Sequence, residues 1–418
     1  MTKEKDKLVS ISSASETLSV SIDTIRRWEK KGLIRAVRDK TGHRYFHANE
    51  LLQLKEKTLG KGDVGYKILK KKTPSKYKVV ELFAGCGGLA LGLENAGLKA
   101  ELLAEIDKKA AETLKTNRPK WNVIADDIKN VDFSKIKADV VAGGFPCQAF
   151  SYAGKRMGFE DTRGTLFFEF ARAIKEINPI VILGENVKGL EKHDNGRTLR
   201  TMMEVLDELG YKAYYKVLRA QYLDVPQKRE RLVIIGVRKN YSSKIAYPKE
   251  KNYTVSIGEA LKGVPKSDGQ IYTAKKKKIM DLIPQGGYWK DLPDKLQREY
   301  MGGSYHLGGG KTGMARRLSA DEPSLTLTCN PAQKQTERCH PLETRPLQVR
   351  EYARIQSFPD TWQFSGSVAS QYKQIGNAVP VELGKQLALQ IKKDSKNAKP
   401  STNKKLTKGT VKEFNKSA

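Results

Sequence analysis

The chain has 418 residues, 39% of them hydrophobic and 30% charged, and this length suggests two or three domains rather than one compact core. Its 77 Lys and Arg outnumber 47 Asp and Glu, and the resulting net charge of +30 favours a polyanionic partner such as nucleic acid. No run of about 18 apolar residues exists and no apolar stretch follows the N-terminal charges, so the sequence predicts neither a membrane span nor a signal peptide.

The four cysteines are scattered along the chain. None of Cys86, Cys147, Cys329 and Cys339 has CxxC spacing, which argues against a zinc site or a disulfide framework. We therefore expect no metal and a reducing, intracellular compartment.

Residues 1–60 predict a small helical unit followed by a hairpin. Ile22, Ile25 and Trp28 recur at helical spacing. The segment RAVRDKTGHRYF then alternates around a Lys-Thr-Gly turn, as short hairpins do. Residues 61–76 are rich in Gly and Lys and favour a linker.

From Tyr77 to about residue 240, short apolar runs alternate with helical patterns. The runs are KVVELF, AELLAEI, ADVVAGG, IVILGENV and RLVIIGVR, and the first two helices are expected at 88–97 and 108–118. This alternation predicts an α/β fold with a doubly wound, Rossmann-like sheet.

The alternation stops after the fifth run. Residues 241–335 hold GGYW, MGGSYHLGGGKTG and many lysines, and predict a loop-rich insertion. Helix-like order returns in 336–391, which we expect to complete the sheet domain. Residues 392–418 hold 9 Lys against 2 acids and predict a disordered basic tail.

The first run ends in a glycine-rich turn that is typical of a nucleoside pocket. Gly85, Gly87 and Ala90 match G-x-G-x-x-A between a strand and a helix. Glu105 follows 20 residues after Gly85, where a carboxylate can accept both ribose hydroxyls, and Asp127 comes after the next strand. A purely structural Gly-rich turn remains open, and the pattern does not separate a dinucleotide from S-adenosylmethionine.

The third run leads into GGFPCQAFS and a candidate nucleophile. Cys147 lies just past the carboxyl end of a strand, where doubly wound folds place their sites. A lone cysteine is more often a small buried apolar residue. Pro146 before it, Gln148 and Ser151 after it, and the charged loop YAGKRMGFEDTRGT favour a thiol that acts under a closing loop.

Two further runs add an acid and two arginines. Glu185 lies in GENV, and Arg229 with Arg231 in VPQKRER are two apart, as on one face of a strand. A surface ion-pair face is the alternative for the arginines. Together with Cys147, these groups suit chemistry on cytosine: a thiolate adds to carbon 6, the acid bonds ring N3, and an arginine holds O2.

Eight short motifs occur along the chain in the same order as in a known enzyme family. They are ELFAGCGG, AEID, DDI, GGFPCQAFS, GENV, VPQKRER, RPLQVREYARIQSFPD and QYKQIGNAVP, and they run from Val79 to about Leu389. In these motifs the chain resembles the bacterial DNA (cytosine-5) methyltransferases of type II restriction–modification systems.

The resemblance implies S-adenosylmethionine as cofactor, double-stranded DNA as substrate, and a target cytosine that is flipped out of the helix. It implies a target-recognition domain in 241–335 and a bacterial cytoplasmic enzyme that acts as a monomer. The catalytic roles fall on Cys147, Glu185, Arg229 and Arg231, and DNA contacts of the closing loop on Gln148 and Ser151. Cofactor contacts fall on Phe83, Gly85, Gly87, Glu105, Ile106, Asp127, Ile128, Phe145 and Asn377, with Phe83 packed on the adenine and Glu105 on the ribose.

Residues 1–60 lie outside that resemblance and look like the winged helix-turn-helix of the MerR class, in DTIRRWEKKGLI and TGHRYF. This implies a recognition helix from Ser21 to Leu33 and a unit that binds the chain's own promoter, with a dimer through this domain as a possibility. Base contacts would come from Thr24, Arg26 and Arg27, and phosphate contacts from Arg35, Arg38, His43 and Arg44 of the wing. A helical appendage that does not bind DNA is the alternative.

Two other functions are consistent with parts of the sequence. One is an RNA or tRNA methyltransferase, against which the N-terminal unit and the long insertion argue. The other is a repressor with a degenerate enzyme body, against which intact Cys147, Glu185 and Arg231 argue.

Overall fold

The computed structural model describes residues 8–18, 22–30, 34–39, 41–48, 50–51, 76–146, 166–242, 246–308, 311–397 and 399–400. The chain forms two compact units. The first, which we call the sheet unit, comprises Lys71–Arg219, Glu230–Lys249 and Leu383–Ala418. The second unit comprises Met1–Lys70, Ala220–Arg229 and Glu250–Glu382. Residues 336–382, which we expected to complete the sheet domain, thus group with the loop-rich insertion.

The sheet unit is built on a seven-stranded sheet of order β6-β5-β4-β7-β8-β11-β9. The first five strands are parallel, and β11 runs antiparallel to both β8 and β9. The predicted Rossmann-like fold is confirmed. In that order, the strands are β6 (Val123–Ile124), β5 (Lys99–Ala104), β4 (Lys78–Leu82), β7 (Val140–Gly143), β8 (Val181–Val187), β11 (Glu230–Arg238) and β9 (Tyr211–Arg219).

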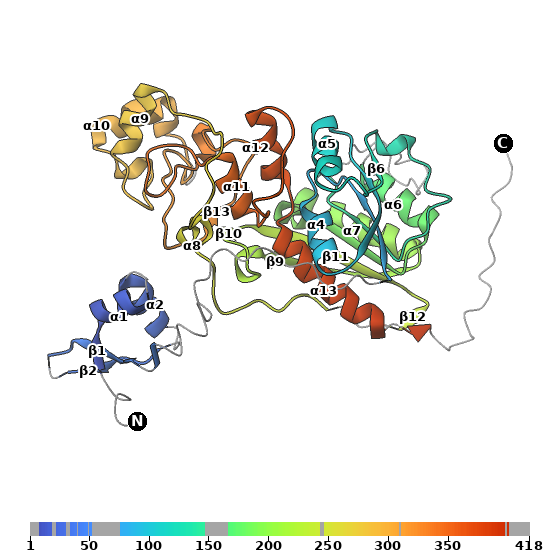
Figure 1. Cartoon of the computed structure of the whole chain (residues 1–418), viewed down its shortest axis with the longest axis horizontal. Helices are drawn as coiled ribbons and strands as arrows, with labels where there is room; N and C mark the ends of the chain where they lie inside the picture. The colour runs from blue at the N-terminus through green and yellow to red at the C-terminus, as the bar shows by residue number, and fades with distance from the viewer. Residues whose placement is uncertain are drawn as a thin grey trace. The chain divides into compact units, whose positions relative to one another are not determined.

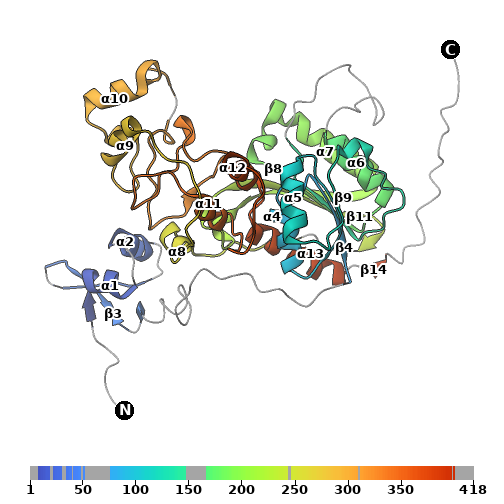
Figure 2. The same cartoon turned by 45° about the horizontal axis from the view of Figure 1, so that its top comes forward.

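Helices cover both faces of this sheet (Figures 1 and 2). Val80 and Leu82 of β4 share a core with α6 and α7. Val79 and Glu81, which point the other way, line a small cavity against α4. The helices are α4 (Gly88–Asn95), α5 (Lys108–Asn117), α6 (Leu166–Ile177), α7 (Arg197–Glu208) and α13 (Val381–Asn397), with short 3-10 turns η1 (Ile128–Asn130), η2 (Lys188–Glu191) and η3 (His193–Gly196). A short antiparallel pair, β12 (Tyr241–Ser242) and β14 (Lys399–Pro400), completes the unit.

Two glycines allow tight packing at the carboxyl end of the central strands. A Cβ on Gly143 would lie 3.0 Å from the Leu82 carbonyl oxygen, and one on Gly184 would lie 3.3 Å from the Phe145 ring. Because β4, β5, β7 and β8 are parallel, the turns that follow β4, β5 and β7 lie along one edge, where such folds bind ligands.

Apart from its N-terminal segment, the second unit consists of short elements joined by long loops. The end of the strand–helix alternation in the sequence predicted this. Within it, Met280, Trp289, Met301, Met314 and Cys339 belong to one small apolar core. The elements are η4 (Ala220–Tyr222), β10 (Gln227–Lys228), α8 (Ile257–Leu261), α9 (Ala274–Asp281), η5 (Trp289–Asp291), α10 (Asp294–Met301), η6 (Gly302–Tyr305), β13 (Ser324–Leu325), η7 (Lys334–Thr336), α11 (Val349–Ile355) and α12 (Val368–Asn377). Strands β10 and β13 pair in parallel.

The N-terminal segment has two helices and a three-stranded antiparallel sheet of order β1-β3-β2. The elements are β1 (Leu8–Ser10), α1 (Ile11–Leu18), α2 (Ile22–Lys30), β2 (Val37–Arg38) and β3 (Arg44–His47). Leu18, Ile25 and Phe46 form part of its core. The predicted hairpin is confirmed by the pairing of β2 with β3, whereas β1 was not expected from the sequence.

Among the described residues, none of the helices is long and apolar enough to cross a bilayer. The same residues contain no group of three or more His, Cys, Asp and Glu that could hold a metal ion.

Candidate active site

The turn between β4 and α4 contains three residues with positive φ, a conformation that most residue types disfavour. Phe83, Gly85 and Gly87 have φ of +57°, +54° and +90°. A positive φ is uncommon for a bulky residue such as Phe83 and is found most often at functional sites. A Cβ on Gly85 would meet no atom within 4 Å, so its positive φ, rather than crowding, favours glycine there.

Glu105 holds this turn from the end of β5. One carboxylate oxygen accepts the Gly85 amide at 2.7 Å, and the other accepts the Asp107 amide at 2.7 Å. Burial raises the pKa of Glu105. Each carboxylate oxygen has a second lone pair, so the group can hold the turn and still accept ribose hydroxyls.

Three further predicted cofactor residues lie in the turns that follow β5 and β6. Asp127 caps η1 and accepts the Lys129 amide at 3.0 Å. Ile128 is buried, whereas the side chain of Ile106 is 66% exposed. An exposed, large apolar side chain beside Glu105 could pack against a flat ring.

Phe145 and Asn186 fix the backbone at the end of the described segment that precedes Cys147. Phe145 is buried against Phe167 and Phe170, with ring centroids 5.4 Å from each. The Asn186 amide nitrogen donates to the Phe145 carbonyl at 2.9 Å, and the Val187 amide donates to the Asn186 oxygen at 2.8 Å. This role of Asn186, in the GENV motif, was not expected from the sequence. Cys147, Gln148 and Ser151 lie outside the described residues.

Glu185 and Arg231 form a buried ion pair in the sheet. Arg231 Nε lies 2.8 Å from Glu185 Oε1, and the side chains are 13% and 11% exposed. Antiparallel pairing of β8 with β11 brings them together. Arg231 stands opposite Val187, and Glu185 lies two residues before Val187, on the same face of the sheet. Burial lowers the pKa of Arg231, and Glu185 opposes that shift. Two residues predicted from separate motifs therefore meet in one site.

Arg229 does not share a strand with Arg231, because β11 begins at Glu230. The sequence prediction of one strand face for both arginines is therefore wrong. The buried guanidinium of Arg229 donates to the carbonyl oxygens of Leu327 at 3.4 Å and Gly376 at 3.2 Å. These bonds turn it toward the main chain of the second unit.

Two buried glutamines, Gln227 and Gln356, continue this network, and we call the pair the amide relay. Gln227 Oε1 accepts the Leu327 amide at 3.0 Å, and Gln227 Nε2 donates to Gln356 Oε1 at 3.0 Å. Gln356 Nε2 in turn donates to the carbonyls of Ile375 at 2.7 Å and Ala378 at 3.1 Å. Because an amide N–H begins the chain and carbonyls end it, the orientation of both side chains is determined.

Asn377 lies in sequence between Ile375 and Ala378, whose carbonyls accept hydrogen bonds from Gln356. It is exposed, and its Oδ1 accepts the Cys329 thiol at 3.1 Å. A Cβ on Gly376 would lie 2.2 Å from the Thr328 carbonyl oxygen, so only glycine permits this close approach of the two segments.

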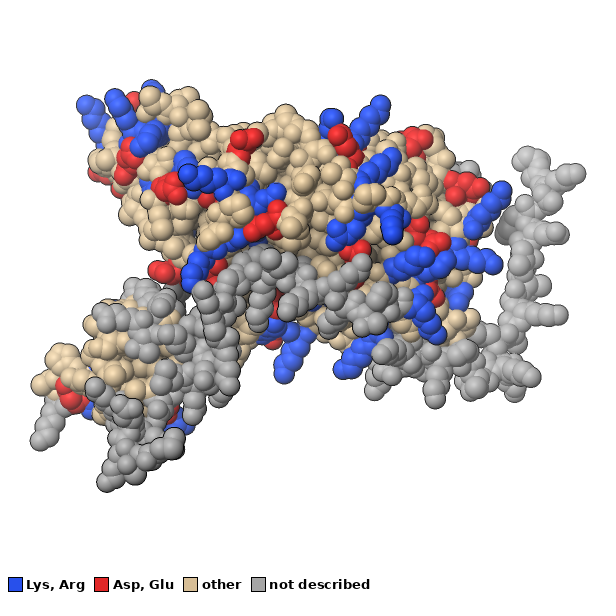
Figure 3. Space-filling model, in the orientation of Figure 1, with Lys and Arg blue, Asp and Glu red and all other residues tan. Residues whose placement is uncertain are grey.

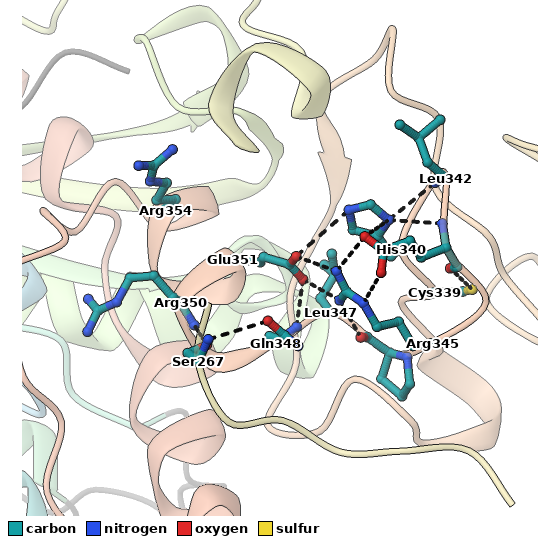
Figure 4. Close-up of polar contacts among 12 residues, drawn as sticks. Ser267, Cys339, His340, Leu342, Arg345, Leu347, Gln348, Arg350, Glu351 and Arg354 are labelled. Atoms are coloured by element: carbon teal, nitrogen blue, oxygen red, sulfur yellow. Dashed lines mark hydrogen bonds and ion pairs between the residues drawn. The ribbon is translucent and has the colours of Figure 1, made fainter. Parts of the chain in front are cut away.

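The RPLQVREYARIQSFPD motif forms a further polar cluster in the second unit (Figure 4). Arg345 binds Glu351 through two nitrogens, at 2.8 and 2.7 Å, and Glu351 also accepts the Gln348 amide at 2.7 Å. His340 Nδ1 accepts the amides of Leu342 and Glu343 at 3.2 and 3.1 Å. Burial lowers the pKa of His340. These contacts hold the loop before α11 and involve none of the predicted catalytic groups.

In the N-terminal segment, Glu29 of α2 binds two wing arginines. It lies 2.7 Å from Arg44 Nε and 3.3 Å from an Arg38 nitrogen. Arg26 is exposed on α2, as a base-contacting residue must be, whereas the side chain of Arg27 lies outside the described part of the chain. These contacts of Glu29 were not expected from the sequence.

Comparisons with known proteins agree with this geometry. The model of the C-5 cytosine-specific DNA methylases matches residues 77–393, and that of MerR family regulatory proteins matches residues 10–46. The chain is 54% identical over 394 residues to the type II methyltransferase M.Eco47II of Escherichia coli, covering 90% of this chain and 93% of that protein. It is 54% identical over 318 residues to M.Sau96I of Staphylococcus aureus, covering 74% of each.

Solved structures share the fold. A prophage-encoded DNA modification methyltransferase of E. coli covers 77% of this chain and 100% of its own, with a TM-score of 0.57 at 24% identity. DNMT2 of Spodoptera frugiperda covers 76% of this chain and 100% of its own, with a TM-score of 0.55 at 18% identity. From the family match over most of its length and from these relatives, the chain belongs to the C-5 cytosine-specific DNA methylases and carries a MerR-like segment at its N-terminus.

Proposed function

We propose that this enzyme methylates carbon 5 of one cytosine in a specific DNA sequence and thereby protects the host DNA from a cognate restriction nuclease. The relatives that are 54% identical are type II methyltransferases. The observation that carries the catalytic part is the buried Glu185–Arg231 pair, because it sets an acid and a cation beside the turn that leads to Cys147.

The proposed reaction begins at Cys147. Its thiolate donates an electron pair to carbon 6 of a flipped cytosine, and the ring electrons move toward carbon 5. Glu185 bonds ring N3 and Arg231 holds O2, so the developing charge is stabilised in a site that excludes water. Once carbon 5 has its methyl group, loss of the carbon-5 proton returns electrons to the ring and breaks the sulfur–carbon bond, which restores Cys147.

The cofactor proposed for this site is S-adenosylmethionine, which supplies an electrophilic methyl group when bound. The turn with three positive φ values and the Glu105 carboxylate fit a nucleoside with its ribose at the end of β5. Phe83, Asp127 and Ile128 would hold the adenine, and Ile106 and Phe145 would complete the pocket.

Target recognition is assigned to residues 241–335. The described part of this stretch is built from short elements and loops and contributes all but Cys339 of the buried residues in one small apolar core. Lys275, Lys277 and Lys278 of α9 are exposed, and Figure 3 shows Lys and Arg side chains over α9 and α10. Loops supported on an independent core suit sequence reading, since the loops can vary while the sheet stays the same.

Bisulfite sequencing of DNA and RNA from a bacterial host that expresses the chain tests the proposal. We expect one methylated DNA motif, no methylated tRNA, and no methylation with Cys147→Ser. DNA with 5-fluorocytosine at the target should trap the wild type covalently, because fluorine does not leave as the proton does. Methylation of tRNA alone would point to the RNA enzyme, and an inactive wild type would point to a degenerate repressor.

A second proposal concerns the N-terminal segment, which we infer binds the promoter of its own operon. Its MerR-like match and the arrangement of α1, α2 and the β2–β3 wing support this role. In the full chain, we expect a discrete footprint upstream of its own gene in excess competitor DNA. Arg27→Ala should erase the footprint without slowing methylation of a short duplex. Uniform protection along the DNA would leave only non-specific binding.

A further inference from the structure

One arginine outside all predicted motifs ties the turn after β6 to helix α6. Arg172 Nη2 donates to the Ile128 carbonyl at 2.8 Å, and Nη1 donates to the Val131 carbonyl at 3.0 Å. The guanidinium carbon also lies 5.1 Å from the centre of the Phe133 ring. A single side chain on α6 thus contacts the beginning, middle and end of residues 128–133.

Two acids on the same helix orient this guanidinium through hydrogen bonds. Glu169 accepts Arg172 Nε at 2.8 Å, and Glu176 Oε1 accepts Nη1 at 3.1 Å. The other oxygen of Glu176 accepts the Phe133 amide at 3.1 Å, so the acid binds the same segment directly. These bonds come from three different nitrogens of a rigid planar group, which a lysine ammonium cannot reproduce.

We propose that Arg172 is a positioning residue for adenine binding: through the carbonyls of Ile128 and Val131 it holds η1 so that Asp127 and Ile128 meet the adenine of the cofactor. The inference rests on the proposed adenine role of these two residues. Asp127 caps η1 with its own side chain, so a shift of the turn would move the carboxylate and the neighbouring Ile128 together.

The position of Arg172 predicts which ligands depend on it. Residues 128–133 follow β6, at one end of the sheet, whereas Glu185 and Arg231, which are proposed to bind the cytosine, lie on β8 and β11. Loosening η1 should therefore weaken the binding of every ligand that contains adenosine, by the same factor. It should leave kcat of the bound complex unchanged.

The test uses Arg172→Lys and Arg172→Met in the full chain. Dissociation constants for S-adenosylhomocysteine and for adenosine are measured by calorimetry, with KM for S-adenosylmethionine and kcat from steady-state methylation. We expect each dissociation constant and the KM to rise about tenfold, as for one lost charged hydrogen bond, with kcat unchanged at saturation. Arg238→Lys is the matched control, since Arg238 also donates to a carbonyl, that of Asn178 at 3.2 Å, but on another part of the sheet unit.

Asp127→Ala separates this inference from the function on which it rests. If Asp127→Ala weakens both ligands and Arg172→Lys does not, the positioning role is overturned and the adenine assignment stands. If neither variant changes either affinity, the adenine assignment itself fails and the inference falls with it. A lower melting temperature with unchanged affinities would also overturn it, because the arginine would then act on stability alone.

Discussion

Glu185 and Arg231 lie on neighbouring antiparallel strands, and their 2.8 Å ion pair sets an acid beside the turn that follows β7. Glu185→Gln removes the charge but keeps the shape, so the loss should fall on the transition state. We expect kcat to drop by about a hundred- to a thousandfold, as for one lost electrostatic contact in an enclosed site. Single-turnover methylation measures this. Calorimetry should show unchanged cofactor affinity, and near-normal turnover would place the acid elsewhere.

Glu81 is the most unusual titratable residue of the sheet unit. It is buried under α4, its Oε2 has no hydrogen-bond partner among the described residues, and burial raises its pKa well above the usual value. A carboxyl whose pKa is higher when folded keeps its proton while the unfolded chain loses it. The stability of the fold therefore declines as pH rises above about 4.5 toward the raised value.

Glu81→Gln should remove this pH dependence. We expect its melting temperature to exceed that of the wild type at pH 8 and to match it near pH 5. Thermal unfolding at both values checks this, with Glu208→Gln as an exposed control that should change little. A variant that is less stable than the wild type at pH 8 would contradict the assignment of a carboxyl that folding keeps protonated at a cost in stability.

The amide relay acts at the scale of elements, because it joins β10, the segment after β13, the end of α11 and the end of α12. Gln356→Glu places an oxygen where Nε2 now donates to two carbonyls, inside a fully buried site. We expect a loss of about 3–5 kcal/mol at pH 8, as for an uncompensated buried charge.

Urea denaturation at two pH values tests this prediction. Because protonation of the new acid restores one donor, part of the lost stability should return at pH 5.5. Gln371→Glu is the control, since Gln371 also donates to a carbonyl, that of Gly366 at 3.0 Å, but is not buried. Equal stability of Gln356→Glu and wild type at pH 8 would show that the relay does not hold these segments.

The sequence predicts the elements whose strands are buried on both faces. β4, β7, β8 and β11 were all expected, because a continuous apolar run signals a covered strand. It did not indicate β9, whose residues alternate irregularly and are largely exposed at the edge of the sheet. The two acids predicted to bind ligands, Glu105 directly after β5 and Glu185 within β8, could be located because these apolar runs could be recognised.

Residues that act through another residue could not be predicted in this way. Asn186, Arg172 and Glu29 carry no pattern of their own, because their partners are carbonyls or charges that only the fold brings near. Arg229 was misplaced for the same reason: its bonds to Leu327 and Gly376 span more than ninety residues of sequence. Local spacing carries no information about such contacts.

At the scale of the whole molecule, the block 241–335 should be exchangeable. It is continuous in sequence and contributes most of one small core, in which Trp289 and Met301 are buried and which Cys339 completes from outside the block. Replacing it with the corresponding block of a family member that marks a different sequence should change the methylated sequence to that of the donor and keep cytosine-5 chemistry. Bisulfite sequencing reads the outcome. An active chimaera that still marks the original sequence would place recognition elsewhere.

The contacts of Glu29 have a consequence for the ionic atmosphere of DNA. A free arginine that docks on a phosphate displaces condensed counterions, and each neutralised phosphate steepens the dependence of log affinity on log salt by about 0.9. Arg38 and Arg44 share the carboxylate of Glu29, so the three groups present one net positive charge instead of two. The N-terminal segment should therefore release fewer ions than its arginines suggest, and Glu29→Gln should steepen its salt dependence by about one phosphate. Filter binding of promoter DNA across a salt series measures that slope. An unchanged slope would mean that both ion pairs of Glu29 break when the segment binds DNA.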